Sequence, residues 1–120
     1  MAHEVARLAS AKKASDIAIL AMADAVGYTD FFVICSGANA RQTRAISDAV
    51  LKGLREQKVR PTRVEGEREG EWILLDLLDV VVHVFTPATR DFYRLESLWN
   101  DVPRETFDES AISAATGVQP

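Results

Sequence analysis

Two aspartates and a histidine lie close together in the second half of the chain, at Asp76, Asp79 and His83. A divalent-metal transferase needs carboxylates that converge on one cation, often two aspartates that alternate along one face of a strand. Here the aspartates are three residues apart across an expected turn, and no third carboxylate stands on a nearby expected strand. Because aspartate also bonds backbone amides in turns, we expect these two to shape the turn rather than to catalyse a reaction.

His83 can serve as a general base or as a metal ligand. The other histidine, His3, is in the N-terminal segment, and no cysteine or acidic cluster stands at ligand spacing, so the pattern does not favour zinc. Two interpretations stay open. His83 is bonded to a neighbouring carboxylate, Asp76 or Asp79, or it contacts a partner in an interface. We favour the interface.

Two further groups with chemical potential lie at the end of an apolar run. Ser36 and Gly37 stand between an expected strand and an expected helix, where free amides and the helix dipole favour a phosphate. The segment matches neither GxxxxGK[ST] nor GxGxxG, so a structural role for Gly37 is the favoured interpretation. Cys35 precedes them inside the apolar run, where a thiol is normally unreactive.

Residues 72–85 mix side chains that a two-residue strand period separates into two sets. The first set is aliphatic: Ile73, Leu75, Leu77, Val80, Val82 and Val84. The second set is mixed: Trp72, Leu74, Asp76, Asp79, Val81, His83 and Phe85. Large aromatic side chains beside carboxylates are typical of a docking surface. We therefore favour Trp72 and Phe85 as interface anchors over core residues covered by a helix, whereas for Trp99 the core interpretation stays open.

The order of elements predicts an α/β domain with a mixed sheet and helices packed on it. The expected elements are a helix at 4–13, strands at 16–22 and 31–35, a helix at about 39–57 capped by Asn39, a strand at 62–65, two strands within 72–85, and a final helix that carries Tyr93, Glu96 and Trp99. The last three strands are expected to be partly antiparallel, because their connections are short. Periodicity is lost after 103, so we expect a domain at 1–103 and a disordered tail at 104–120.

Composition bounds the class of protein and its partners. The chain has 120 residues, 48% hydrophobic and 27% charged, which is typical of one globular domain. It shows no apolar run long enough to span a membrane and no signal peptide, and its single cysteine fits a reducing cytoplasm. A net charge of −4 disfavours broad contact with nucleic acid and suits a basic protein partner.

Several segments together resemble the ribosomal silencing factor family, RsfS, also called Iojap. They are TDFFVICSG at 29–37, Arg41-Gln42, Ala45-Ile46, Glu65-Gly66, Trp72, Leu75-Asp76, DVVVHVF at 79–85, and Tyr93, Leu95, Glu96 and Trp99. The resemblance covers residues 11–103. In one departure, family members often carry glycine where this chain has Leu78. Because leucine resists positive φ, we expect a wider turn there, with Leu78 exposed near the contact surface.

The resemblance implies a fold related to the nucleotidyltransferases without their catalytic carboxylates. It also implies a factor that binds the large ribosomal subunit through its fourteenth protein, on the face that meets the small subunit. Such a factor blocks subunit joining and lowers translation, notably in starved cells. A role in late maturation of the large subunit is also discussed for this family.

We therefore expect a cytoplasmic translation repressor that acts without catalysis or cofactor. The residues expected to bind the ribosomal protein are Trp72, Leu74, Asp76, Asp79, His83, Phe85, Tyr93, Glu96 and Trp99. Two alternatives stay open. One is a metal-dependent nucleotidyltransferase that uses Asp76 and Asp79. The other is a homodimeric scaffold whose mixed face pairs with itself, which is compatible with the first hypothesis.

Overall fold

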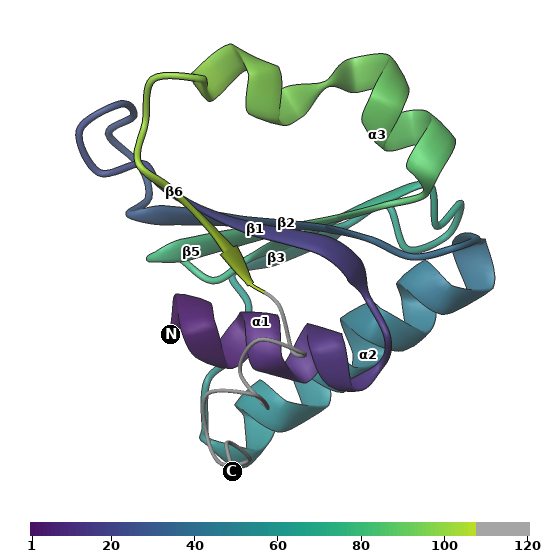
Figure 1. Ribbon diagram of the computed structural model, residues 1–120. Coiled ribbons are helices and arrows are strands. Elements are labelled where there is room, and N and C mark those ends of the chain that lie inside the picture. Colours follow the sequence, from purple (N-terminus) through teal and green to yellow (C-terminus); the bar gives the residue numbers. More distant parts are fainter. Residues whose placement is uncertain (108–120) are drawn as a thin grey trace, which may run out of the picture.

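The computed structural model describes residues 1–107, which form one six-stranded sheet between two layers of helices. The elements are α1 (Ala2–Ala11), β1 (Ser15–Ala21), β2 (Phe31–Ser36), α2 (Ala40–Glu56), β3 (Arg63–Glu65), β4 (Trp72–Asp76), β5 (Val80–Phe85), α3 (Pro87–Tyr93), the 3-10 helix η1 (Leu95–Trp99) and β6 (Arg104–Phe107). In Figure 1, α1 and α2 lie against one face of the sheet, and α3 lies over the other.

The sheet is mixed, as the sequence predicts. Its strand order is β3-β4-β5-β2-β1-β6. The central pair, β2 and β5, is parallel, with Ile34 opposite His83, and the other pairs are antiparallel. The predicted antiparallel pairing of the last three expected strands is confirmed, because β3, β4 and β5 follow one another as neighbours.

The aliphatic set predicted from the two-residue period faces α1 and α2. Its members belong to one buried cluster with Val5 of α1 and with Ile46, Val50 and Leu54 of α2. The N-cap of α2 is also as predicted, since the side chain of Asn39 accepts a hydrogen bond from the Gln42 amide at 2.9 Å. This face of the sheet is therefore sealed by helices.

The expected boundary at 103 is wrong. Residues 104–107 form β6, which pairs with β1 at the sheet edge and places Phe107 opposite Ile17. Most of this edge strand is exposed, so it lacks the alternation of apolar and polar residues that marks a half-buried strand. The remainder of the expected tail, 108–120, lies outside the described residues.

The final helix is also shorter than predicted. It breaks at Arg94, which adopts a left-handed conformation with φ of 49° and separates α3 from η1. Neither α3 nor η1 contains a buried residue. The layer over the second face of the sheet is therefore two short pieces that cover it only in part.

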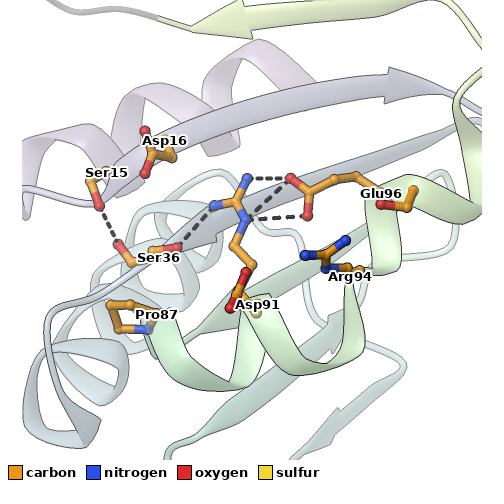
Figure 2. Close-up of a pocket in the computed structure, with 9 residues that line it drawn as sticks. Ser15, Asp16, Ser36, Pro87, Asp91, Arg94 and Glu96 are labelled. Atoms are coloured by element: carbon orange, nitrogen blue, oxygen red, sulfur yellow. Dashed lines mark hydrogen bonds and ion pairs between the residues drawn. The ribbon is translucent and has the colours of Figure 1, made fainter.

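An arginine ties these two pieces to the sheet. Arg90 of α3 donates from Nε and one terminal nitrogen to the carboxylate of Glu96 in η1, and from its other terminal nitrogen to the Ser36 hydroxyl of β2 at 2.9 Å (Figure 2). Burial alone raises the pKa of Glu96, but the hydrogen bonds and charge of Arg90 outweigh it, so this pKa lies below its usual value. The ion pair therefore holds α3, η1 and β2 in one arrangement.

Replacing Arg90 with methionine is expected to lower the free energy of unfolding by about 2 kcal/mol, because it leaves the mostly buried Glu96 carboxylate without its partner. Denaturant unfolding followed by tryptophan fluorescence measures this change. Arg41→Met, at an exposed position of α2, is the control and should stay close to wild type. Equal stability of the two variants would contradict the tethering role.

Candidate functional site

The mixed set of residues 72–85 lies on the face of the sheet that α3 and η1 cover in part. A second buried cluster forms there, with Phe32, Ile34, Val81 and Phe85 at its centre. The half-buried residues packed against it are Val26, Trp72, Leu74, Leu95, Trp99 and Val102. The two-residue period thus assigned the side chains of β4 and β5 to the correct faces. We call the mixed face with its half-buried rim the docking face.

Aromatic rings form a continuous line across the docking face. The ring of Trp72 lies 4.9 Å from Phe85, 5.0 Å from Tyr93 and 6.0 Å from His83, measured between centroids. His83 in turn lies 4.8 Å from Phe32. The line ends in exposed rings, because Tyr93 contacts Phe92 on α3 and Phe32 contacts Tyr28 in the loop before β2. Trp72 therefore joins the buried rings to exposed ones.

His83 supports Trp72 rather than bonding a carboxylate. The indole Nε1–H of Trp72 donates to His83 Nδ1 at 3.1 Å, which leaves the imidazole proton on Nε2. Burial lowers the pKa of His83 to about 4, so its ring is neutral at physiological pH. The alternative interpretation, a bond to Asp76 or Asp79, is therefore wrong, and with 4% of its surface exposed His83 offers little area for the interface contact that the sequence favoured.

Within residues 1–107, two buried side-chain nitrogens have no hydrogen-bond partner, His83 Nε2 and Trp99 Nε1. His83 belongs to the mixed set of β5, where its ring contacts Phe32 and Trp72, and Trp99 of η1 packs against the same face. An unmade hydrogen bond at a buried donor costs about 1–3 kcal/mol. Both unpaired nitrogens thus lie on the docking face rather than on the face that α1 and α2 cover.

The turn between β4 and β5 uses one of the two aspartates structurally. Asp76 Oδ1 accepts from the amide of Leu78 at 3.0 Å, which confirms the prediction of turn chemistry for this residue. Asp79 is exposed, and its carbonyl accepts from the amides of Asp30 and Phe31. No group of three or more His, Cys, Asp or Glu side chains in the described part of the chain is arranged to hold a metal ion.

Leu78 has φ of 74°, so the expectation that leucine would prevent a tight turn with positive φ is wrong. The Asp79 amide bonds the Leu77 carbonyl at 3.0 Å, and the Leu77 amide bonds the Val80 carbonyl at 2.9 Å, which closes the turn around Leu78. The expected exposure of Leu78 is confirmed, because 63% of its surface is accessible, and its place near a contact surface stays a prediction.

Polar groups at the start of α2 that could bind a phosphate are bonded within the chain. The Ala38 amide is bonded by the Gln42 side chain at 2.7 Å, the Gln42 amide is bonded by Asn39, and the Ser36 hydroxyl is bonded by Arg90. A Cβ on Gly37 would lie 2.9 Å from a backbone nitrogen of α2, so close packing explains the glycine. Burial raises the pKa of Cys35 to about 12, which agrees with the predicted inert thiol.

A cleft of about 340 Å³ opens beside Arg90, between β1, β2 and the α3–η1 layer. Its charged lining residues are Asp16, Arg90, Asp91, Arg94 and Glu96. Positive and negative groups alternate there (Figure 2), and Arg90 is already bonded to Glu96. The lining therefore carries both signs of charge and does not point to an anion or to a cation as its ligand.

The structure separates the predicted contact residues by exposure. Trp72, Leu74, Asp76 and Trp99 are half-buried, Asp79 and Tyr93 are exposed, and Glu96 is half-buried and bonded to Arg90. Phe85 is fully buried, with its ring 4.9 Å from that of Trp72, so the prediction that it is an interface anchor is wrong. Sequence reasoning missed Tyr28 and Phe92, which are 65% and 79% exposed. A signal was available for Tyr28, an aromatic residue in an expected loop next to an apolar strand.

His83→Gln is expected to make stability less sensitive to acid. The lowered pKa means that the unfolded chain binds a proton below pH 6.5 while the folded chain does not, so His83 costs about 2 kcal/mol of stability between pH 7.5 and pH 5. Glutamine keeps an acceptor for Trp72 and does not titrate. Urea unfolding at both pH values measures the loss in each protein.

Glu4 and Glu96, whose pKa values are lowered, titrate alike in both proteins and cancel in that comparison. Identical losses of stability in wild type and His83→Gln would show that burial does not hold the imidazole neutral.

None of the helices in the described part of the chain is long and apolar enough to cross a membrane.

Comparison with known proteins supports the resemblance seen in the sequence. The family described as "Ribosomal silencing factor during starvation" matches residues 1–119. A ribosomal silencing factor RsfS of Halalkalibacterium halodurans is 42% identical over 92 residues, covering 77% of this chain and 79% of that protein. Mitochondrial assembly of ribosomal large subunit protein 1 of Mus musculus is 30% identical over 112 residues, covering 91% of this chain and 48% of the mouse protein.

A solved structure has the same fold. A crystal structure of a Chromobacterium violaceum protein matches with a TM-score of 0.77 at 35% identity, covering 83% of this chain and 87% of that one. The sequence match and the structural match thus agree. The chain belongs to the RsfS family of ribosomal silencing factors.

Proposed function

We propose that this protein binds the large ribosomal subunit through a basic ribosomal protein on the intersubunit face, the fourteenth of that subunit, and so blocks joining of the small subunit. The observation that carries the proposal is the docking face, where half-buried Trp72 and Leu74 and exposed Tyr93 offer apolar surface, while Asp79 is exposed in the turn at the other end of the β4–β5 hairpin from Trp72. The names of the relatives support it, since they refer to ribosomal silencing and to large-subunit assembly.

The charge of the strands and loops that form the sheet part of the face favours a basic protein as the partner. Neither residues 14–40 nor residues 69–89, which supply β1, β2, β4 and β5, contain a lysine or an arginine. They contain seven acidic residues: Asp16, Asp24, Asp30, Glu69, Glu71, Asp76 and Asp79. An acidic surface attracts a basic partner and speeds their encounter. The half-buried aromatic and aliphatic side chains then supply the apolar burial that holds the complex.

In this proposal the protein represses translation by its size alone, without catalytic turnover. The described part of the molecule measures 42 × 32 × 32 Å. A body of that size on an intersubunit face prevents the small subunit from closing against it. In this proposal the protein acts in the cytoplasm, without a cofactor and with little direct contact to nucleic acid.

We also propose that the fold is related to that of the nucleotidyltransferases but lacks their catalytic activity. The Ser36–Gly37 turn between β2 and α2 corresponds to a phosphate-binding turn whose amides and hydroxyl are now bonded within the chain. Asp76, which a metal-dependent transferase would need, is bonded to the turn that it closes. These contacts favour a structural role for the Ser36–Gly37 turn and for Asp76.

Asp79→Lys is expected to weaken binding to the large subunit about tenfold, because it places a cation against a basic surface. Asp79 is preferred to Asp76 for this test, since Asp76 also bonds the Leu78 amide and its loss would disturb the turn. Co-sedimentation with separated ribosomal subunits, over a range of protein concentrations, measures the affinity.

Asp48→Lys is the matched control. It makes the same change of charge at an exposed position of α2, on the opposite side of the sheet, and should bind like wild type. Equal weakening by both variants would indicate a general charge effect rather than a docking face. Absence of wild-type protein from the large-subunit pellet would reject the proposed function.

A further inference from the structure

The turn at Leu78 is strained for a residue with a side chain. Its φ of 74° and the hydrogen bond from the Asp79 amide to the Leu77 carbonyl form a three-residue γ-turn with positive φ. This turn is rare, and positive φ is disfavoured for any residue with a Cβ. Asp76 stabilises it by bonding the Leu78 amide at 3.0 Å. The chain therefore holds a costly conformation at Leu78.

Packing within the domain does not explain a leucine there. Leu77 and Val80, on either side of the turn, are buried and hold the turn against the helical face. The side chain of Leu78 itself is 63% exposed. Glycine would adopt the same φ without strain and without exposing apolar surface. Strained backbone of this kind collects at functional sites, where a side chain must be presented in a fixed direction.

A second exposed apolar side chain belongs to the same end of the sheet. The carbonyl of Asp79 accepts from the amides of Asp30 and Phe31 at 3.0 and 3.1 Å, which joins the Leu78 turn to the loop before β2. That loop carries Tyr28, which is 65% exposed and packs near Phe32 at one end of the line of rings. Leu78 and Tyr28 therefore extend the docking face beyond Trp72 and Leu74.

The surroundings of this extension are acidic. Asp30 and Asp79 are exposed and adjacent through the backbone bond described above, and Asp76 is half-buried behind them. A neighbouring cation, Arg63, lies opposite Asp76 in the β3–β4 register, and its Nε bonds Glu65 at 2.9 Å. The complementary surface is an apolar hollow bordered by lysine or arginine. A second copy of this chain fits poorly, because its own aspartates would face these.

We propose that Leu78 is an apolar anchor of the docking face, which inserts into a hydrophobic hollow bordered by basic side chains on the partner protein, with Tyr28 as its flanking contact. This assignment rests on the proposed function for the identity of the partner. It adds a contact residue, and the strained turn is the device that fixes its direction before binding. The leucine is thus retained for recognition at the expense of stability.

Leu78→Gly distinguishes a role of Leu78 in binding from a role in folding. A binding role predicts lower affinity without lower stability, and a folding role predicts lower stability. Glycine relieves the positive φ and removes the anchor, so the melting temperature should rise or stay unchanged while affinity for the large subunit falls about fivefold or more. Leu78→Met keeps a flexible apolar side chain and should bind within about twofold of wild type. Thermal melts and co-sedimentation titrations with large subunits measure both quantities.

Lys58→Gly is the matched control. Lys58 is exposed, has φ of 64° and follows α2, so its replacement relieves a similar strain away from the docking face. It should gain stability and keep its affinity. If Leu78→Gly binds within about twofold of wild type, the anchor role is refuted. If wild type itself does not bind large subunits, the proposed function fails and the partner assigned to Leu78 fails with it.

Discussion

All six residues of β5 are buried, so the centre of the sheet must be covered on both faces. Two full helices cover one face, where the aliphatic side chains of β4 and β5 pack against α1 and α2. The other face has only α3 and η1, which contain no buried residue of their own. The rings of Phe32 and Trp72 therefore bury His83 and Phe85 from the side, and the indole hydrogen bond to His83 fixes the ring of Trp72. The second face therefore depends on aromatic side chains, rather than on full helices, to bury the centre of the sheet.

This arrangement leaves apolar surface open without loosening the core. Trp72 is packed and hydrogen-bonded on one side and meets exposed Tyr93 on the other. A rigid, partly exposed aromatic side chain loses little entropy on binding, which is a property of interface hot spots. Arg90 stabilises the edge of the site by joining α3 and η1 to β2. The acidic residues around the turns then select a basic partner. Packing and electrostatics thus favour the same kind of complex.

The sequence was sufficient to predict the mixed sheet, the Asn39 cap and the two faces of residues 72–85, because these depend on local periodicity and capping. It was not sufficient to predict which members of the docking face are exposed, since the burial of His83 and Phe85 depends on where α3 and η1 settle. The break at Arg94 carries no glycine or proline signal, and β6 pairs with a strand far away in the sequence. At Leu78 the hydrogen bonds of the turn overcame the preference of leucine for negative φ.

The central claim is that occupancy of the large subunit excludes the small one. Light scattering during subunit association, with large subunits preincubated at increasing protein concentration, tests it most directly. The account predicts that joining falls in proportion to the fraction of large subunits occupied, with half-inhibition at the dissociation constant from co-sedimentation. Undiminished joining by large subunits that remain saturated with the protein would contradict it, because the bound domain would then lie away from the subunit interface.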